Sequence, residues 1–297
     1  MEMFLQLIVS GLANGAIYSL IALTLCIIYK GTDVINFAVG EVVMFGAFFA
    51  FTFSVVWKFP FIVTYIVAAF IVPVVLGFKI ERFVARPMIP GGHLTMVIGT
   101  FALSFALRGL GRRIWGSDSW ALPSMFGTEP ISISLAGDRT LILSPENLIM
   151  LLASPLAMVA FYLFFKFCKL GKMMRASQEN PVGASLVGID IYKMFSLTWI
   201  IGCILSCWAG LLLAPVSLVY VEMGAKVTFK GFAALVLGGF GVIPGAIIGG
   251  VMMGLIEALF AGYITTAMTD LSSLLVIFLV VSIRPTGILG RKRIEKL

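Results

Sequence analysis

Few side chains in the apolar stretches of this 297-residue sequence could carry chemistry, and the acidic ones are the most informative. Glu41 and Glu257 stand inside long hydrophobic runs, and Asp270 stands near the end of another. A charged side chain at the centre of a bilayer costs at least about 2.5 kcal/mol on insertion scales. We therefore expect Glu41 and Glu257, together with Asn14 and Asn36, to face the protein interior, where they are candidates for lining a solute pathway.

The other reactive side chains indicate no catalytic centre. The four cysteines show neither a pairing pattern nor a metal-ligand pattern, and Cys203 and Cys207, one helical turn apart, have no histidine nearby. The only histidine, His93, lies in a connection expected at headgroup level. The phosphate-binding pattern GxxxxGK[ST] does not occur in the chain. The sequence therefore predicts no catalytic residues, no cofactor site and no metal site, and a protein that is not itself an enzyme.

The stretch VLGGFGVIPGAIIGGVMMG (236–254) places seven glycines and a proline in one of the most apolar parts of the chain. Glycines four residues apart share a helix face and let two backbones approach closely in lipid. Gly241, Gly245 and Gly249 have this spacing, as do Gly250 and Gly254.

The Pro244-Gly245 pair predicts a break in the helix near 243–245. Non-helical backbone at membrane depth is tolerated only where protein buries it or where it lines a watery cavity. We interpret Gly241, Pro244, Gly245 and Gly249 as gate candidates, with tight packing alone as the alternative.

The composition indicates that a lipid bilayer surrounds most of this chain. The chain is 60% hydrophobic and 12% charged, against about 25% charged in soluble domains, and its mean hydropathy is +1.09. We expect an all-α polytopic membrane protein that forms one transmembrane domain over 1–297, with eight to nine segments and at least one broken or re-entrant helix. Apolar runs long enough to span a bilayer lie near 4–28, 34–56, 60–78, 94–115, 146–168, 194–220, 231–262 and 264–283.

The formal charge of +7 is best explained by topology, because cytoplasmic loops are enriched in lysine and arginine. Basic residues cluster in 79–86, in 166–193 and at 284–296, and we assign these regions to the cytoplasm. The longest polar connection, about 116–145, is mostly acidic and is placed outside.

Three arginines run against this pattern, since Arg108, Arg112 and Arg113 fall near the outer end of the fourth segment. Either they snorkel to outer headgroups or the boundary is misplaced. After the sixth segment the chain must reach a cytoplasmic C-terminus by an odd number of crossings. We therefore expect 231–262 to form two shorter pieces, either a tight pair of spans or a re-entrant hairpin.

The cytoplasmic connection contains a polar, helix-compatible stretch, GKMMRASQENPVGASLVGID (171–190). Asn180 is suited to cap a short helix with Pro181 in its first turn, and Gly188 is suited to end it. An ordinary amphipathic loop is the alternative. With few acidic residues for ion coupling and no nucleotide-binding loop, the chain fits an energy source that docks from outside.

Four motifs in this order resemble one family, the permeases of the high-affinity branched-chain amino-acid ABC importers of the LivH type. The match runs nearly end to end. One position differs, because Val39 follows Ile35-Asn36-Phe37-Ala38 where the family commonly has histidine. The motifs are NGAIYSLIALTLCIIYKGTDVINFAVGEVVMFGA (14–47), MRASQENPVGASLVGI (174–189), GFAALVLGGFGVIPGAIIGG (231–250) and RPTGILG (284–290).

The resemblance implies a permease subunit in the bacterial inner membrane, surrounded by lipid and without a nucleic-acid partner. Its implied partners are a homologous second permease, two cytoplasmic ABC ATPase subunits and a periplasmic substrate-binding protein that delivers the cargo. ATP binding and hydrolysis would drive alternating access. Within the loop at about 169–193, residues 181–188 would be the coupling helix. The residues implied in coupling are Arg175, Ala176, Asn180, Pro181, Gly183, Ala184 and Gly188.

The implied cargo is a branched-chain or related small amino acid, with a related amide or small organic acid as the alternative. Two other classes stay open on the residues alone. An ion-coupled secondary carrier would require Glu41 or Glu257 for transport without nucleotide. A channel for a small polar organic solute would show passive flux.

Overall fold

The computed structural model describes residues 2–123, 131–135, 139–266 and 268–290, and almost all of its regular structure is helical. This confirms the predicted class of helical polytopic membrane protein. Within the described residues, the exception is a hairpin of two antiparallel strands, β1 (Ile131–Leu135) and β2 (Arg139–Leu143). The basic residues from Arg291 onward lie outside the described part of the chain.

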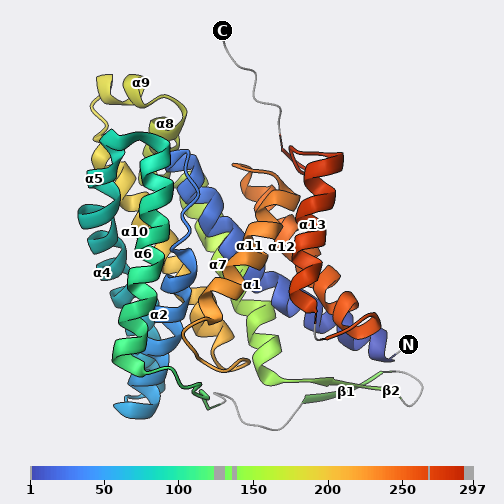
Figure 1. The fold of residues 1–297 in the computed structure, drawn as a ribbon. Coiled ribbons are helices and arrows are strands. Elements are labelled where there is room, and N and C mark those ends of the chain that lie inside the picture. The colour runs from blue at the N-terminus through green and yellow to red at the C-terminus, as the bar shows by residue number, and fades with distance from the viewer. Residues whose placement is uncertain (1, 124–130, 136–138, 267, 291–297) are drawn as a thin grey trace.

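In the part of the chain that the structure describes, six helical stretches are long and apolar enough to cross a membrane. One of them, Ile62–Trp115, contains two crossings, because it reverses at Gly92, where φ is +76°, and its two arms lie side by side in Figure 1. The outgoing arm is α3 (Phe61–Ile66), η2 (Val67–Ile71), α4 (Val72–Ile80), η3 (Glu81–Ala85), α5 (Arg86–Met88) and η4 (Ile89–Gly91), and the returning arm is α6 (Gly92–Trp115).

Each of the other crossings is a single helix, and two of these helices are shorter than the rest. With the reversal at Gly92 counted as two crossings and the shorter helices α11 and α13 included, the described residues form nine such segments, apart from the short helices between Lys169 and Leu186. This number is within the predicted eight to nine. The other crossings are α1 (Glu2–Thr32), α2 (Val39–Phe51) with η1 (Thr52–Val56), α7 (Pro145–Phe167), α10 (Ile191–Leu213), α11 (Met223–Gly238), α12 (Ile243–Tyr263) and α13 (Thr269–Ile283).

Helix α1 crosses the molecule at a tilt and forms its centre (Figure 1). Its 31 residues extend about 46 Å at 1.5 Å per residue, longer than a ~30 Å hydrocarbon layer, so tilting accommodates the excess. Residues 15–28 are almost entirely buried, because α7, α10, α11 and α12 all pack against this helix.

The predicted break in the glycine-rich segment is present but lies slightly earlier than expected. Helix α11 ends at Gly238, a turn follows with φ of +108° at Gly239 and +73° at Gly241, and α12 then begins at Ile243. Pro244 therefore stands in the first turn of α12, where its missing N–H costs nothing. The two glycines make the turn, since left-handed φ angles carry little steric cost for a residue without Cβ.

Two sequence-based boundaries need correction. The sixth crossing ends at Leu213 rather than near 220. The next helix begins at Met223 rather than at 231, so that Lys226 and Lys230 belong to it. A hydropathy criterion excludes lysines from an apolar segment, whereas in the fold Lys230 is balanced by the buried Glu257 and the more exposed Asp270.

The C-terminal motif packs on the turn between α11 and α12. The N–H of Ile288 donates to Leu237 O at 2.9 Å, and the N–H of Leu289 donates to Gly238 O at 3.1 Å. Two of the motifs found in the sequence, the glycine-rich segment and RPTGILG, thus form one structural unit.

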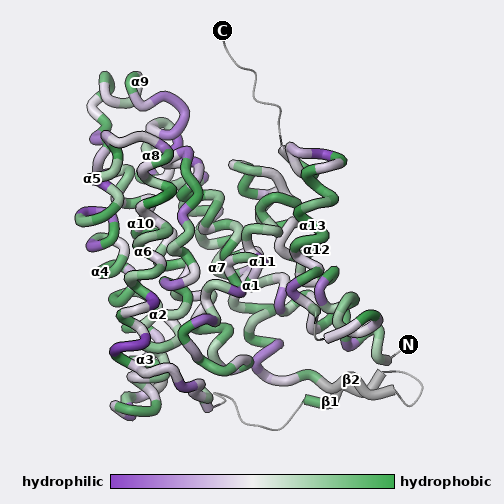
Figure 2. The backbone as a smooth tube through the Cα atoms, viewed as in Figure 1, coloured by the Kyte–Doolittle hydropathy of each residue, from purple (hydrophilic) through white to green (hydrophobic). Residues whose placement is uncertain are grey.

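The two ends of the molecule differ as the charge pattern predicts. Helices α8 (Lys169–Glu179) and α9 (Pro181–Leu186) lie with α5 at one end, and the β hairpin lies at the other (Figure 1). Hydrophobic residues dominate the helices between them, and hydrophilic ones gather towards the ends and at a few interior positions (Figure 2). A backbone pair between Trp120 and Val219, at 2.7 and 2.9 Å, ties the long connection to the loop before α11.

Candidate functional site

The first turn of α2 presents a carboxylate inside the protein. Asn36 Oδ1 accepts a hydrogen bond from the N–H of Ala38 at 2.9 Å, which stabilises the bend that starts the helix. Glu41 follows in the first turn and is 2% exposed. Arg108 Nη2 of α6 donates to Glu41 Oε1 at 2.7 Å. The out-of-pattern arginine is therefore the partner of a buried carboxylate.

A cavity of about 270 Å³ adjoins this pair, between α2, α6 and α11. Asn36, Glu41, Arg108 and Thr228 contribute polar groups to its lining. Much of the remaining wall is aromatic, and it includes the stacked rings of Phe37 and Phe101, whose centroids lie 4.0 Å apart. Asn36 and Glu41 were predicted as pathway candidates, and the fold brings them together here.

One helical turn from Arg108, Arg112 pairs with Glu222 at 2.5 Å. Both side chains are about half exposed, so this pair is a surface feature. The hydrogen bond from Arg112 lowers the pKa of the Glu222 carboxyl below its usual value. Arg113 is exposed.

The second buried carboxylate belongs to a separate cluster. Lys230 Nζ of α11 lies 2.5 Å from Glu257 Oε1 of α12 and 3.3 Å from Asp270 Oδ1 of α13. The ammonium is also 5.9 Å from the ring centre of Tyr18 on α1. Asn14 is half-buried on α1, on the same helix face as Tyr18 because it is four residues away. This cluster joins four helices through one lysine.

The four-residue spacing of glycines in the sequence corresponds to two different helix contacts. Gly245 and Gly249 face α11, where a Cβ at Gly245 would lie 2.5 Å from Gly238 O and one at Gly249 would collide with Ala234 O. Gly250 and Gly254 face α1, against the backbone of Ser19 and Gly15. The predicted close helix contacts at Gly245, Gly249, Gly250 and Gly254 are confirmed.

Gly241 does not belong to these contacts, contrary to the spacing argument. It lies in the turn before α12, where its nearest neighbours are the side chains of Tyr29 and Lys30 at 3.8–3.9 Å. Gly241 and Pro244 line a cavity of about 580 Å³ at the end of the molecule that carries α8 and α9. Of the gate candidates, these two border open space, and Gly245 and Gly249 are packed.

Lys30, Arg175 and Glu179 line the same cavity, and also an adjoining one of about 340 Å³. Arg175 donates to Lys166 O at 3.3 Å and lies over the ring of Phe165. It therefore connects α8 to α7. Ala176, the next residue in the chain, is exposed, and its carbonyl accepts a hydrogen bond from the N–H of Asn180.

The short helix α9 has the local structure predicted for it. Asn180 Oδ1 accepts from the N–H of Gly183 at 2.9 Å, Pro181 stands in the first turn, and Gly188 has a φ of +84° just after the helix. Ala184 is buried against the protein. The opposite side presents Val182, Leu186 and Val187, which are 71%, 82% and 77% exposed.

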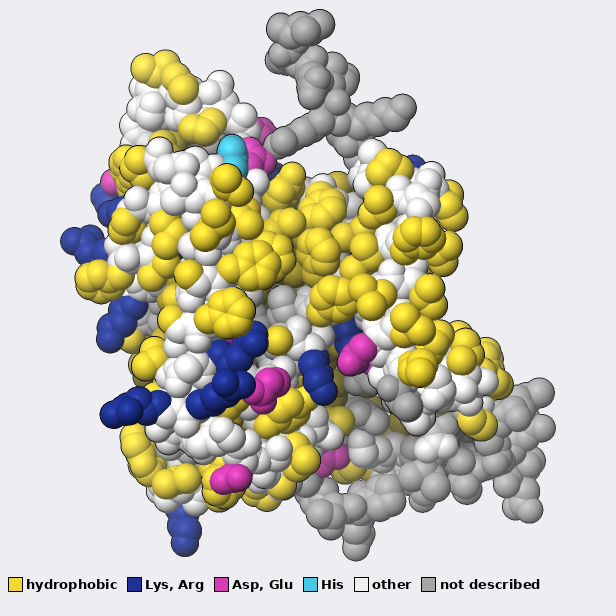
Figure 3. Space-filling view, viewed as in Figure 1, with side chains coloured by type: hydrophobic (Ala, Val, Ile, Leu, Met, Phe, Trp, Pro, Cys, Tyr) yellow, Lys and Arg dark blue, Asp and Glu magenta, His cyan; other side chains and the backbone are white. Residues whose placement is uncertain are grey.

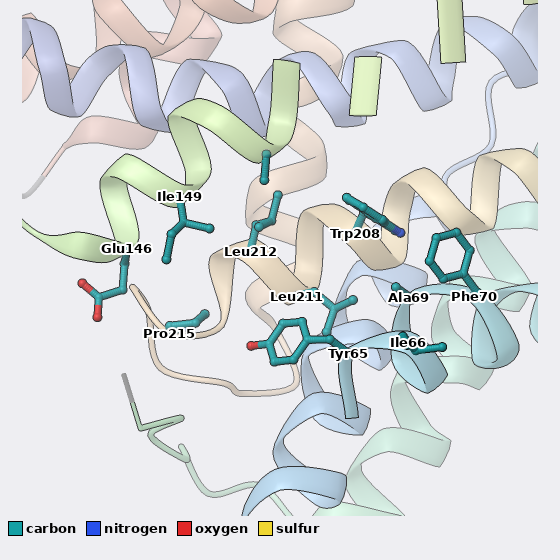
Figure 4. A pocket seen from close by; sticks show the side chains of 11 residues that line it. Tyr65, Ile66, Ala69, Phe70, Glu146, Ile149, Trp208, Leu211, Leu212 and Pro215 are labelled. Carbon is teal, nitrogen blue, oxygen red and sulfur yellow. The ribbon is translucent and has the colours of Figure 1, made fainter. Parts of the chain in front are cut away.

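Another pocket, of about 330 Å³, lies between α3, η2, α7 and α10 (Figure 4). Tyr65 and Phe70 border it on one side, and Ile149, Trp208 and Leu212 on the other. Among the described residues that line it, Glu146 carries the only charge. Such a lining suits hydrocarbon and gives a polar solute little to bind.

Sequence reasoning missed three members of the charged sites, namely Arg108 and Lys230 as counter-ions and Thr228 as a cavity residue. Arg108 could have been found from the sequence, because it is a basic residue near the predicted outer end of a segment, where the charge pattern expects none. Lys230 was not recognised as a membrane-embedded residue, because it stands one residue before the predicted start of the segment at 231–262. Val39, at the position where the resembled family commonly has histidine, is buried at the start of α2.

Comparison with known proteins gives concordant results. Residues 7–283 match the family described as "Branched-chain amino acid transport system / permease component". The chain is 33% identical to the high-affinity branched-chain amino acid transport system permease protein LivH of Salmonella typhimurium, over 99% of this chain and 97% of the relative. It has the same identity and coverage with LivH of Escherichia coli K12. With BraD of Pseudomonas aeruginosa it is 31% identical, over 99% and 98% of the two chains. No solved structure matches it.

Proposed function

This chain belongs to the permease family of branched-chain amino acid transport systems, and from that premise we propose that it is the membrane subunit of an ABC importer for branched-chain or related small amino acids. Its proposed partners are a homologous second permease, two cytoplasmic ATPase subunits and a periplasmic substrate-binding protein. The ATPases supply the energy, because the sequence has no phosphate-binding loop of its own.

The observation that carries this proposal is the exposed apolar tip formed by Val182, Leu186 and Val187. It lies on the loop at the end of the molecule that carries α8 and α9, which the charge pattern assigns to the cytoplasm. Large apolar side chains gathered on a polar loop mark an interaction site. A rigid, capped helix that presents them is suited to transmit movement from an ATPase to α8 and α10 on either side.

The buried acids do not favour an ion-coupled carrier. Glu41 and Glu257 each have a cationic partner within 2.7 Å. A carboxylate neutralised by a neighbouring cation is a poor site for a proton or sodium ion.

Purification in mild detergent tests the assembly. We expect the tagged chain to retain ATPase subunits and a second permease, identified by mass spectrometry, and to hydrolyse ATP only in their company. Sustained hydrolysis by the isolated chain, or recovery of the chain without any ATPase from cells that express the full set of subunits, would contradict the proposal.

Leu186→Asp tests the role of α9. We expect uptake of L-leucine by the reconstituted importer to fall at least tenfold while the protein still inserts and elutes as a single species, because a charge replaces the apolar tip. The readout is uptake per ATP hydrolysed. Leu186→Met, which keeps the apolar surface, is the control and should remain active.

Normal uptake by Leu186→Asp would show that α9 is an ordinary solvated loop. Substitution at Gly183 is a less clean probe, because a Cβ there would lie 2.9 Å from the Asn180 amide and disturb the cap.

A further inference from the structure

Three buried polar atoms, on residues that line the cavity between α2, α6 and α11, have no hydrogen-bond partner among the described residues. They are Glu41 Oε2, Arg108 Nε and Thr228 Oγ1. Leaving such a group unpaired costs about 1–3 kcal/mol, and more when it is charged. All three belong to residues that line one cavity, so a small side-chain rotation towards it would give each atom a partner in a polar ligand.

The fold fixes these groups from three directions. Asn36 shapes the start of α2, which sets the position of Glu41. Gly40 allows α11 to approach, since a Cβ there would lie 2.5 Å from Thr228 Oγ1 and from Gly224 O. The hydroxyl of Thr228 is thereby held against the first turn of α2. Arg108 reaches the same place from α6 through its contact with Glu41.

The charges at the cavity select one class of ligand. Glu41 and Arg108 form a neutral pair through Oε1 and Nη2. Each keeps one atom without a partner among the described residues, Oε2 as acceptor and Nε as donor. A ligand with a single charge would leave the buried site charged, which is unfavourable at low dielectric. A zwitterion with an ammonium and a carboxylate a few ångströms apart can satisfy both free atoms and leave the site neutral.

The rest of the wall suits an aliphatic side chain. Phe37, Phe101, Phe229 and Phe232 line the cavity. Its volume of about 270 Å³ lies just below the ~300–1,000 Å³ of sites for drug-sized ligands, so it matches one small molecule. Figure 3 shows charged side chains of both signs gathered at mid-height on the face that carries α6, with hydrophobic side chains around them.

We infer that this cavity binds the zwitterionic head of an aliphatic amino acid during transport. Glu41 accepts hydrogen bonds from the ammonium, Arg108 and Thr228 donate to the carboxylate, and the aromatic wall receives the side chain. The inference rests on the proposed function and adds to it the place where this chain itself contacts the cargo.

The test is equilibrium binding of tritiated L-leucine to the purified importer complex in nanodiscs, without the substrate-binding protein. Two competitors each carry half of the head group: 4-methylpentanoate has the carboxylate alone, and 3-methylbutylamine has the ammonium alone. In the unmodified complex, L-leucine should compete at least tenfold better than either.

Removing either charge should change which of the two half-ligands binds better, and the two variants should do so in opposite directions. Glu41→Gln leaves Arg108 without a counter-ion, so leucine should bind at least tenfold more weakly and 4-methylpentanoate should become the better of the two half-ligands. Arg108→Gln should favour 3-methylbutylamine. Thr228→Val should weaken leucine binding about threefold or more, by loss of one hydrogen bond. A misfolded site would lose all three ligands together and could not produce opposite preferences.

Glu222→Gln is the matched control, since it removes the same charge from the neighbouring pair with Arg112, outside the cavity. It should leave leucine binding unchanged. Equal binding of leucine by Glu41→Gln, Arg108→Gln and the unmodified complex would overturn the inference, as would absence of leucine binding to the unmodified complex. If the complex contains its ATPases in these experiments, the proposed function stands even when the inference fails.

Discussion

Replacing Lys230 by methionine is expected to destabilise the folded protein by about 3–5 kcal/mol, the cost of leaving one member of a buried ion pair without its partner. Lys230 is 14% exposed and Glu257 11% exposed, and their charged atoms are 2.5 Å apart. Without the lysine, the carboxylate of Glu257 would remain among α1, α11 and α12 with its charge unbalanced. Asp270 would suffer less, because its side chain is 63% exposed.

Thermal unfolding in detergent, followed by size-exclusion chromatography, measures this effect. The double variant Lys230→Met with Glu257→Gln should recover part of the loss, because it removes the unpaired charge. Lys193→Met is the control. Lys193 pairs with Asp190 at 3.3 Å, but the two side chains are 78% and 46% exposed, and such surface pairs contribute about 0–1 kcal/mol. If Lys230→Met unfolded at the same temperature as Lys193→Met, the cluster would have no role in holding α11, α12 and α13 together.

Gly254→Leu is expected to prevent α1 and α12 from packing, with a cost at or above the upper end of the ~1–3 kcal/mol usual for overpacking. A Cβ at Gly254 would collide with the backbone of Gly15 and Gly11. The contact is reciprocal, since a Cβ at Gly15 would lie 2.9 Å from Val251 Cα. Backbone atoms cannot move aside by changing rotamer, so only separation of the two helices relieves the clash.

Gly109→Leu makes a matched comparison for that variant. Gly109 also lies within a long helix, α6, but a Cβ there meets nothing within 4 Å. We expect Gly109→Leu to be neutral or slightly stabilising, because glycine is about 1 kcal/mol worse than alanine inside a helix. The yield of monodisperse protein and its melting temperature distinguish the two variants. Equal values would mean that the small residues of α1 and α12 do not determine the packing.

Much of the architecture follows from local features of the sequence. Long apolar runs, basic connections and the residues Asn180, Pro181 and Gly188 predict the membrane class, the sidedness and the helix α9. Their signals are local because hydropathy, charge and capping depend on residues within a turn or two of one another. The break before α12 was also predicted, with an error of a few residues, because the glycines at 239 and 241 form the turn and Pro244 only begins the next helix.

The tertiary structure alone decided which distant residues meet. Glu41 and Arg108 are 67 positions apart, and Lys230 and Glu257 are 27 apart. A hydropathy scale counts each of these charges as a cost in its own segment. Packing places opposite charges together, where their attraction offsets part of the cost of removing them from water. For the same reason the spacing of Gly250 and Gly254 indicated a close helix contact without naming α1 as the partner. The sequence by itself predicted that the two buried glutamates and the spaced glycines would face inward, and only the packing of α1, α2, α6, α11 and α12 determined what they would face.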